Sequence, residues 1–226
     1  MRKLLPVIAA GLFFTNFAHA AETIIPGNTA RNVSNFNSGR ALGFDLAFSD
    51  ESANLEVLSP IRRFTRGKAG GTLESKGLTS LGFFYNELDD FVGHLKLVAV
   101  GNQAVTRIPY QLEFGVKGYI GRVKQDDTDV GALAIGGAIK IQNPFSRRPN
   151  RAVNNPIDLK IEGFFTPGIT TFGDTDSLLE IAARLSIEIV PAAKAFIGYR
   201  LLEVENDSAA TLELDDNIHF GFRAQF

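Results

Sequence analysis

The last ten residues alternate between apolar side chains and polar or small ones, and this pattern constrains the fold more than any other feature of the chain. The apolar set comprises Ile218, Phe220, Phe222, Ala224 and Phe226, and the other set comprises Asn217, His219, Gly221, Arg223 and Gln225. A period of two predicts a β-strand with one apolar and one polar face. At the edge of a soluble sheet, such a strand would expose its phenylalanines or require a covering layer. We therefore expect its apolar face to lie against a nonaqueous environment.

Nine further segments upstream show the same alternation. They span residues 41–48, 54–61, 79–85, 91–99, 110–121, 132–141, 157–162, 179–189 and 195–202. A helix is excluded for 179–189, because Glu180, Arg184 and Glu188 would share one helix face while Ile and Leu encircled the rest. Pro60 is expected to weaken the end of the second segment, since it cannot donate a ladder hydrogen bond. Segments of about ten residues suit tilted strands that cross a bilayer.

These segments predict an all-β fold. It is an antiparallel up-and-down transmembrane β-barrel of ten strands over residues 40–226, with eight strands as the alternative. A hydropathy scan does not detect such a fold, because its apolar residues alternate with polar ones along each strand. This explains why 45% of the residues are hydrophobic although no stretch after residue 20 is apolar enough for a transmembrane helix.

The connections between these segments sort by charge. Numbered in order, the odd ones carry the acidic residues Asp50, Glu51, Glu87, Asp89, Asp90, Asp126, Asp127, Asp129, Asp174, Asp176, Glu205 and Asp207. The even ones carry the basic residues Arg62, Arg63, Arg66, Lys68, Arg107, Arg147, Arg148, Arg151 and Lys194. Solvation of loops explains the presence of charge but not its separation by sign. Odd and even connections lie at opposite ends of an up-and-down barrel, so the sorting favours ten strands and places both termini at the periplasmic end.

The amino terminus has the organisation of a secretory signal peptide. Two basic residues precede a short apolar run, and Ala18 and Ala20 then supply a small-x-small cleavage pattern. The run is too short for a stable transmembrane helix. We expect residues 1–20 to be removed on export, residues 21–39 to form a loose leader, and the remainder to fold as one domain.

Composition excludes several classes of protein. The chain has no cysteine, which rules out a disulfide framework and a thiolate metal site. The formal net charge of −2 provides no basic field for nucleic acid. No motif for a cofactor is present, so we expect none.

The polar faces of the predicted strands carry charges of both signs in equal number. The acids are Asp45, Glu56, Glu113, Asp158, Glu162, Glu180 and Glu188, and the bases are Lys96, Lys117, Lys140, Lys160, Arg184, Arg200 and Arg223. Near-neutral pairing suits a closed interior, where an unpaired charge is costly. We therefore expect this charge network to face the lumen and to fill it, so that the barrel is not an open porin.

Two histidines and one acidic cluster are the candidates for chemistry. His94 and His219 are predicted on the inward face, His94 in the outer part of its strand and His219 near the outer start of the last strand. We interpret them as lumen-filling polar residues, with a catalytic or metal pair as the alternative. The cluster 126–129 (DDTD) lacks the spacing and terminal Glu of an EF-hand loop, which favours a solvated hairpin tip over a divalent cation site or a cation bridge to lipopolysaccharide.

Several segments resemble known outer-membrane proteins. The terminal strand, with Ile218, Phe220, Phe222 and the final Phe226, is similar to the closing strand of bacterial outer-membrane β-barrels. The segments GALAIGGAIKI (131–141), EGFFTP (162–167), FIGYR (196–200) and IHFGFRAQF (218–226) resemble, in their order and spacing, the YfaZ-like family of such proteins. The likeness covers residues 115–226, and the connection 143–156 is longer than is usual in that family.

The resemblance implies a barrel in the outer membrane of a Gram-negative bacterium and carries over no catalytic residue. Its expected partners are outer-membrane lipid and lipopolysaccharide, together with the outer-membrane assembly machinery, which would recognise the C-terminal strand. We expect a monomer that acts as a non-enzymatic structural barrel or a narrow porin-like channel for small solutes. The alternative is a membrane-embedded lipid hydrolase or acyltransferase that uses His94 or His219.

Overall fold

The computed structural model describes residues 42–68, 71–103, 110–124, 126–145, 156–190, 192–208 and 210–226. The predicted signal peptide and leader lie outside these residues. The described elements are β1 (Gly43–Phe48), β2 (Ser52–Lys68), β3 (Gly71–Asn86), β4 (Phe91–Gln103), β5 (Tyr110–Val123), β6 (Thr128–Gln142), β7 (Ile157–Phe165), the 3₁₀ turn η2 (Gly168–Thr170), β8 (Thr171–Gly173), β9 (Thr175–Val190), β10 (Ala193–Asn206) and β11 (Thr211–Gln225).

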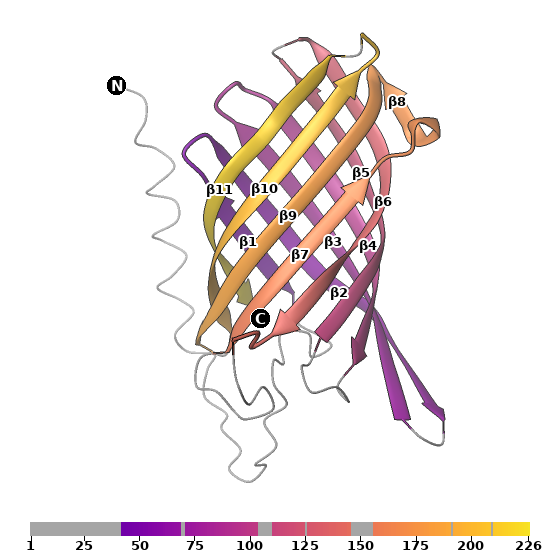
Figure 1. The fold of residues 1–226 in the computed structure, drawn as a ribbon, viewed down its shortest axis with the longest axis vertical. Coiled ribbons are helices and arrows are strands. Elements are labelled where there is room, and N and C mark those ends of the chain that lie inside the picture. The colour runs from indigo at the N-terminus through magenta and orange to yellow at the C-terminus, as the bar shows by residue number, and fades with distance from the viewer. Residues whose placement is uncertain are drawn as a thin grey trace. The chain divides into compact units, whose positions relative to one another are not determined.

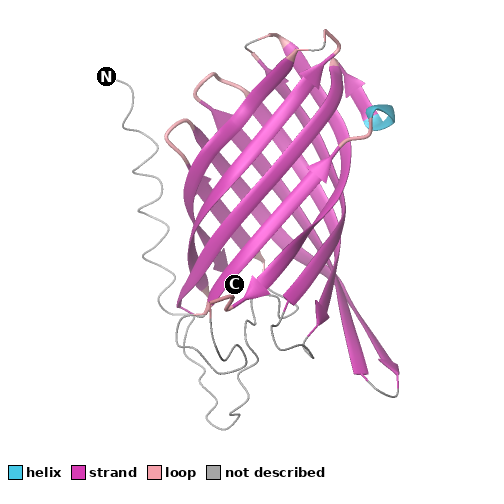
Figure 2. Cartoon of the chain, viewed as in Figure 1, coloured by secondary structure: helices cyan, strands magenta, loops and turns pink. Residues whose placement is uncertain are grey.

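Ten of the strands form one closed antiparallel barrel (Figures 1 and 2). Each pairs with its neighbour along the chain, and β1 pairs with β11 from Gly43↔Gln225 to Phe48↔Phe220, which closes the ring. The remaining strand of the sheet, β8, is not part of this ring and pairs with β6. The prediction of ten barrel strands is confirmed and the alternative of eight is wrong. Closure removes the two edge strands that an open sheet of these ten strands would have.

Burial alternates along the strands as predicted. In β4, Phe91, Leu95 and Leu97 are exposed, whereas His94 and Lys96 are buried. In β11, Phe220 is 62% exposed although its neighbour His219 is only 5% exposed. In these strand segments the apolar side chains therefore point out of the barrel and the charged ones point into it.

The β2–β3 hairpin is longer than the sequence analysis predicted. The second strand was expected to end at Ile61, with Arg62, Arg63, Arg66 and Lys68 in a connection, but β2 continues to Lys68. Pro60 was expected to weaken the strand end, and instead the strand runs through it with a shift of register between Pro60 and Arg62. Proline is tolerated at bulges and edges. Both conditions hold here, because the pairing of β2 with β1 ends at Leu58.

The terminal strand is also longer, since β11 begins at Thr211 and not at Asn217. A register shift opposite Leu202 and Glu203 leaves Leu214 without a partner in the ladder, and both Leu214 and Asp215 are buried. The bulge therefore places two consecutive residues on the inside. Because the bulge interrupts the period of two, the alternation of the sequence did not predict this part of the strand.

The connections described by the structure define two ends of the barrel. The acidic end carries the connections β1–β2, β3–β4, β5–β6, β7–β9 and β10–β11, with Asp50, Asp89, Asp127 and Asp207 among their residues. The opposite end, here called the basic end, carries the strand ends that flank the even connections, and both ends of the described chain. Arg107, Arg147, Arg148 and Arg151, which were predicted in those connections, lie outside the described residues. Between β7 and β9 the chain bulges out of the wall (Figure 1), and η2 and β8 expose Ile169 and Phe172.

Close to the acidic end, the inward side chains are apolar. Ten of them are buried in one cluster, here called the apolar cap: Phe84, Val92, Val123, Val130, Phe164, Leu178, Leu202, Val204, Leu212 and Leu214. They lie on the strand segments next to the odd connections, so they close the lumen above the charged residues. The apolar cap was not predicted from the sequence.

Candidate functional site: the charge-paired lumen

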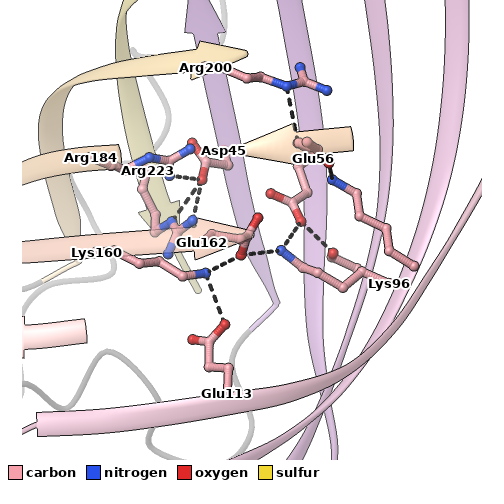
Figure 3. Close-up of polar contacts among 12 residues, drawn as sticks. Asp45, Glu56, Lys96, Glu113, Lys160, Glu162, Arg184, Arg200 and Arg223 are labelled. Carbon is pink, nitrogen blue, oxygen red and sulfur yellow. Dashed lines mark hydrogen bonds and ion pairs between the residues drawn. The ribbon is translucent and has the colours of Figure 1, made fainter. Parts of the chain in front are cut away.

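The lumen is filled by ion pairs that join strands far apart in the sequence (Figure 3). All of the charged residues predicted on the inner face take part: Asp45, Glu56, Lys96, Glu113, Lys117, Lys140, Asp158, Lys160, Glu162, Glu180, Arg184, Glu188, Arg200 and Arg223. The alternation of strand residues brings them to one side of the wall, and closure of the barrel then turns them toward one another.

The central group is a chain of five alternating charges that crosses the lumen. Lys96 Nζ lies 3.2 Å from Glu56 Oε1 and 3.3 Å from Glu162 Oε2. Lys160 Nζ lies 2.7 Å from Glu162 Oε2 and 2.9 Å from Glu113 Oε2. Since β2 and β7 stand on opposite sides of the ten-strand ring, the chain from Glu56 to Glu162 spans the interior.

A second group surrounds Asp45 next to the barrel closure. Its carboxylate pairs with the guanidinium groups of Arg184 on β9 and Arg223 on β11. The Arg223 Nε–H also donates to Asp45 Oδ2 at 3.1 Å. Arg184 stacks over the ring of Phe196, with its Cζ 3.9 Å from the ring centroid. The seam between β1 and β11 is thus held by buried charge as well as by the backbone ladder.

A third group lies under the apolar cap and is centred on Glu180. This carboxylate accepts a hydrogen bond from Lys117 Nζ at 2.6 Å and another from the Tyr119 hydroxyl, and it lies 3.1 Å from Arg200 Nε. Arg200 Cζ is 4.9 Å from the centroid of the Phe84 ring, and Lys117 Nζ is 5.7 Å from that of Phe164. Two cations of the network therefore lie within cation–π range of aromatic rings of the cap.

The fourth group lies at the basic end. Asp158 pairs with Lys140 at 3.3 Å and with Lys194, and Lys194 is 4.0 Å from Glu188. Lys194 was expected in a solvated connection, but it is buried at the start of β10.

Sequence reasoning missed two members of the network, Lys194 and Asp215. Asp215 lies before the predicted start of the last strand and pairs with His219 at 2.9 Å and Arg200 at 3.8 Å. Adding one acid to the seven predicted and one base to the seven predicted gives eight of each, so the described lumen remains balanced. The alternation from Phe196 back to Lys194 could have identified the lysine, whereas the bulge concealed Asp215.

Both histidines face the lumen, and His94 and His219 line the same cavity of about 60 Å³. The prediction that His219 lies near the start of its strand is wrong, because β11 begins earlier and the residue falls in its middle. Its Nε2 contacts Asp215, while the Ser52 hydroxyl donates to the other oxygen of that carboxylate at 3.3 Å. A histidine that activates a hydroxyl nucleophile must be hydrogen-bonded to it. In the described part of the chain, no serine or threonine hydroxyl is hydrogen-bonded to either imidazole.

The turns at the acidic end are paired and solvated. The Arg122 Nε–H donates to Asp127 at 3.1 Å, and the same Nε lies 3.9 Å from Asp129, within the cluster considered for a cation. Hydrogen bonds from the Tyr85 hydroxyl and from Lys124, at 3.1 Å, lower the pKa of the Asp89 carboxyl. Among the residues described, no group of three or more acids and histidines is arranged to hold a metal ion.

The residues of the C-terminal signal lie on the outer surface. Ile218, Phe220, Phe222 and Phe226 are all more than half exposed, and the Phe226 ring packs edge-on against Phe44 with centroids 5.7 Å apart. No helix in the described ranges has the length and hydropathy to span a membrane.

A closed sheet with an apolar exterior and an ion-paired interior inverts the arrangement of a soluble barrel. This combination defines the class as transmembrane β-barrels. The chain belongs to the YfaZ family, since the family described as YfaZ precursor matches residues 61–226. The match begins well before residue 115, where the likeness was expected to start, and the word precursor accords with the predicted signal peptide.

Other comparisons add little to the family match. No curated protein matches the chain. Among solved structures, the outer membrane channel DcaP of Acinetobacter baumannii aligns with 88% of this chain at 9% identity and a TM-score of 0.37. The chain spans 56% of that channel's length.

Proposed function

We propose that this protein is a non-enzymatic structural barrel of the bacterial outer membrane whose lumen is closed at rest. The observation that carries the proposal is the pair of barriers in series, the charge network and the apolar cap. Either one alone obstructs the passage of a hydrated solute. The network presents ions already paired with one another, and the cap offers a permeating ion no polar partner to replace its hydration shell.

The exterior supports a membrane location. Large apolar side chains are exposed on every barrel strand, and they include Phe44, Leu55, Phe83, Leu95, Phe114, Leu133, Ile161, Leu185, Ile197 and Phe220. In water such a belt would drive aggregation, whereas hydrocarbon accommodates it without cost. Outer-membrane lipid and lipopolysaccharide are the proposed surroundings, the assembly machinery is the proposed partner of β11, and the protein is proposed to be a monomer.

Planar-bilayer recording of the purified, refolded protein tests the closed lumen. We expect no discrete conductance steps at moderate voltage. Reproducible openings of uniform size in the wild-type protein would overturn the closed state and support the narrow solute channel instead. Heat-modifiable migration on a gel serves as the control that the recorded protein is folded.

Lipid hydrolysis by the wild-type protein, His94→Ala and His219→Ala tests the absence of enzymatic activity. We expect no hydrolysis above the background of the empty detergent–lipid mixture for all three proteins. Both histidines are buried on the inner side of the barrel wall, away from the lipid-facing surface. An activity that the wild-type protein shows and either variant loses would overturn the proposal.

A further inference from the structure

Between β7 and β9 the chain leaves the barrel wall and returns to it before β9 begins (Figures 1 and 2). β7 ends at Phe165, and the 3₁₀ turn η2 follows. β8 then pairs with β6, from Ala132↔Thr171 to Val130↔Gly173. We call residues 166–173 the outer excursion.

The outer excursion differs in composition from the turns at the acidic end. Its sequence is TPGITTFG, which contains no charged residue. The β1–β2, β3–β4, β5–β6 and β10–β11 turns each contain an acid, among them Asp50, Asp89, Asp127 and Asp207. In the excursion, Ile169 is 93% exposed and Phe172 is 56% exposed. The excursion therefore presents apolar side chains where the other turns present carboxylates.

These apolar side chains adjoin the lipid-facing belt at both ends of the excursion. Phe165, at the entry, is exposed and lies opposite the exposed Ile135 of β6. Phe172, at the exit, lies opposite Gly131, and a Cβ on that glycine would be 2.3 Å from Phe172 Cδ2. The phenylalanine ring thus covers the glycine on the outer face of the wall. On its other side Gly131 pairs with Ile120 of β5, which is also exposed.

Several polar groups at the tip of the excursion are already hydrogen-bonded within the protein. The Thr170 N–H donates to the Pro167 carbonyl oxygen at 2.9 Å. The Thr170 hydroxyl donates to the Leu133 carbonyl oxygen of β6 at 2.8 Å, and the Thr171 hydroxyl donates to the Gly168 carbonyl oxygen at 2.9 Å. Pro167 has no N–H that needs a partner. These bonds lower the cost of placing the tip in hydrocarbon, where lipid offers no partner.

We propose that the outer excursion inserts among the acyl chains of the leaflet at the acidic end of the barrel, with Ile169 as its foremost contact. The proposal rests on the membrane location proposed above. It goes further, because it places a connection in the hydrocarbon together with the strands. An uncharged segment whose apolar side chains continue the belt is suited to acyl chains, whereas the acidic turns require water.

The chain contains no tryptophan, so a single substitution creates a unique fluorescent reporter. Ile169→Trp reports on the excursion. Leu88→Trp is its matched control, because Leu88 is also apolar and 51% exposed but lies in the acidic β3–β4 turn. Leu95→Trp, in the lipid-facing belt of β4, reports on the membrane location.

Each refolded full-length protein is reconstituted in phosphatidylcholine vesicles with or without bromine on the acyl chains, and heat-modifiable migration verifies that it is folded. We expect brominated chains to quench Ile169→Trp about threefold more strongly than Leu88→Trp, since bromine in hydrocarbon quenches only nearby indole rings. Iodide on both sides of the membrane should quench the two reporters in the reverse order, because an anion is excluded from hydrocarbon.

The outcomes separate this proposal from the membrane location. Equal iodide quenching of Ile169→Trp and Leu88→Trp, with Leu95→Trp still quenched by brominated chains, overturns the insertion of the excursion alone. Absence of lipid quenching at Leu95→Trp as well overturns the membrane location. Protection of Ile169→Trp from both quenchers overturns the proposal in favour of a second copy of the chain that covers the excursion, and dilution of the protein in lipid should then remove the protection.

Discussion

At the scale of single residues, the lumen shows how buried charge is made tolerable. Lys96 is 3% exposed and stands between two carboxylates, and Glu180 accepts from an ammonium and a phenol while pairing with a guanidinium. Each ion is compensated by neighbours from other strands. Removing one member leaves its partners charged and without compensation, which costs far more than the net contribution of the intact pair.

Lys96→Met should therefore destabilise the barrel strongly. It leaves the buried carboxylates of Glu56 and Glu162 without their shared cation, and we expect a loss of about 3–5 kcal/mol in the free energy of unfolding. Urea denaturation in lipid vesicles, followed by gel migration, measures it. Lys124→Met is the control, since its side chain is 60% exposed and its pair with Asp89 lies in solvent; its midpoint should equal that of the wild type. Similar midpoints for all three proteins would show that Lys96 is not buried in the lumen.

At the scale of the strands, close approach of neighbouring backbones explains particular glycines. A Cβ at Gly115 of β5 would lie 2.0 Å from the Leu97 carbonyl oxygen and 2.7 Å from the Val98 Cα on β4. Both obstacles are backbone atoms of the adjacent strand, so no side-chain rotation relieves the clash. A Cβ at Gly101, by contrast, would meet nothing within 4 Å.

Gly115→Ala should impair the β4–β5 pairing and Gly101→Ala should not. We expect a loss of about 1–3 kcal/mol for Gly115→Ala, the usual cost of forcing a group into a packed site. The folded fraction after refolding into detergent, read from heat-modifiable migration, distinguishes the two variants. Equal folding of both would contradict the close approach of β4 and β5.

At the scale of the whole molecule, the two barriers act in series. The charge network spans the middle of the lumen, and the apolar cap closes it near the acidic end. A structure with two obstructions conducts only when both are removed, because the remaining one still blocks the path.

Combined variants test this arrangement. The cap variant Phe164→Ala with Leu202→Ala and the network variant Lys96→Ala with Glu162→Ala should each remain closed in planar bilayers. The network variant removes one charge of each sign, so the lumen stays neutral. The fourfold variant should show discrete openings. Conductance in the cap variant alone would mean that the charge network does not obstruct the lumen.

Sequence patterns predicted most of the barrel because two of them, the alternation within each strand and the sorting of connections by charge, can be recognised without tertiary information. The alternation in β9, with Glu180 and Arg184 on one side and leucine or isoleucine on the other, reports which faces meet ions and which meet hydrocarbon. The sorting of connections by sign reports the number of strands. The failures are local: the bulges at Ile61 and Leu214 each interrupt the period, and the three residues of β8 are too few to show one.

The candidate site was predicted as a set of residues but not as a set of contacts. The amino-acid pattern was sufficient to predict ten strands, because each strand's period of two depends only on that strand, and the balanced charges of the polar faces predicted that these faces line the lumen. The pattern did not predict which acid meets which base, the apolar cap or the length of the β2–β3 hairpin, which depend on how the strands are placed in the barrel. Partners such as Lys96 and Glu162 lie on strands that are not neighbours, and their meeting depends on the stagger of the closed ring.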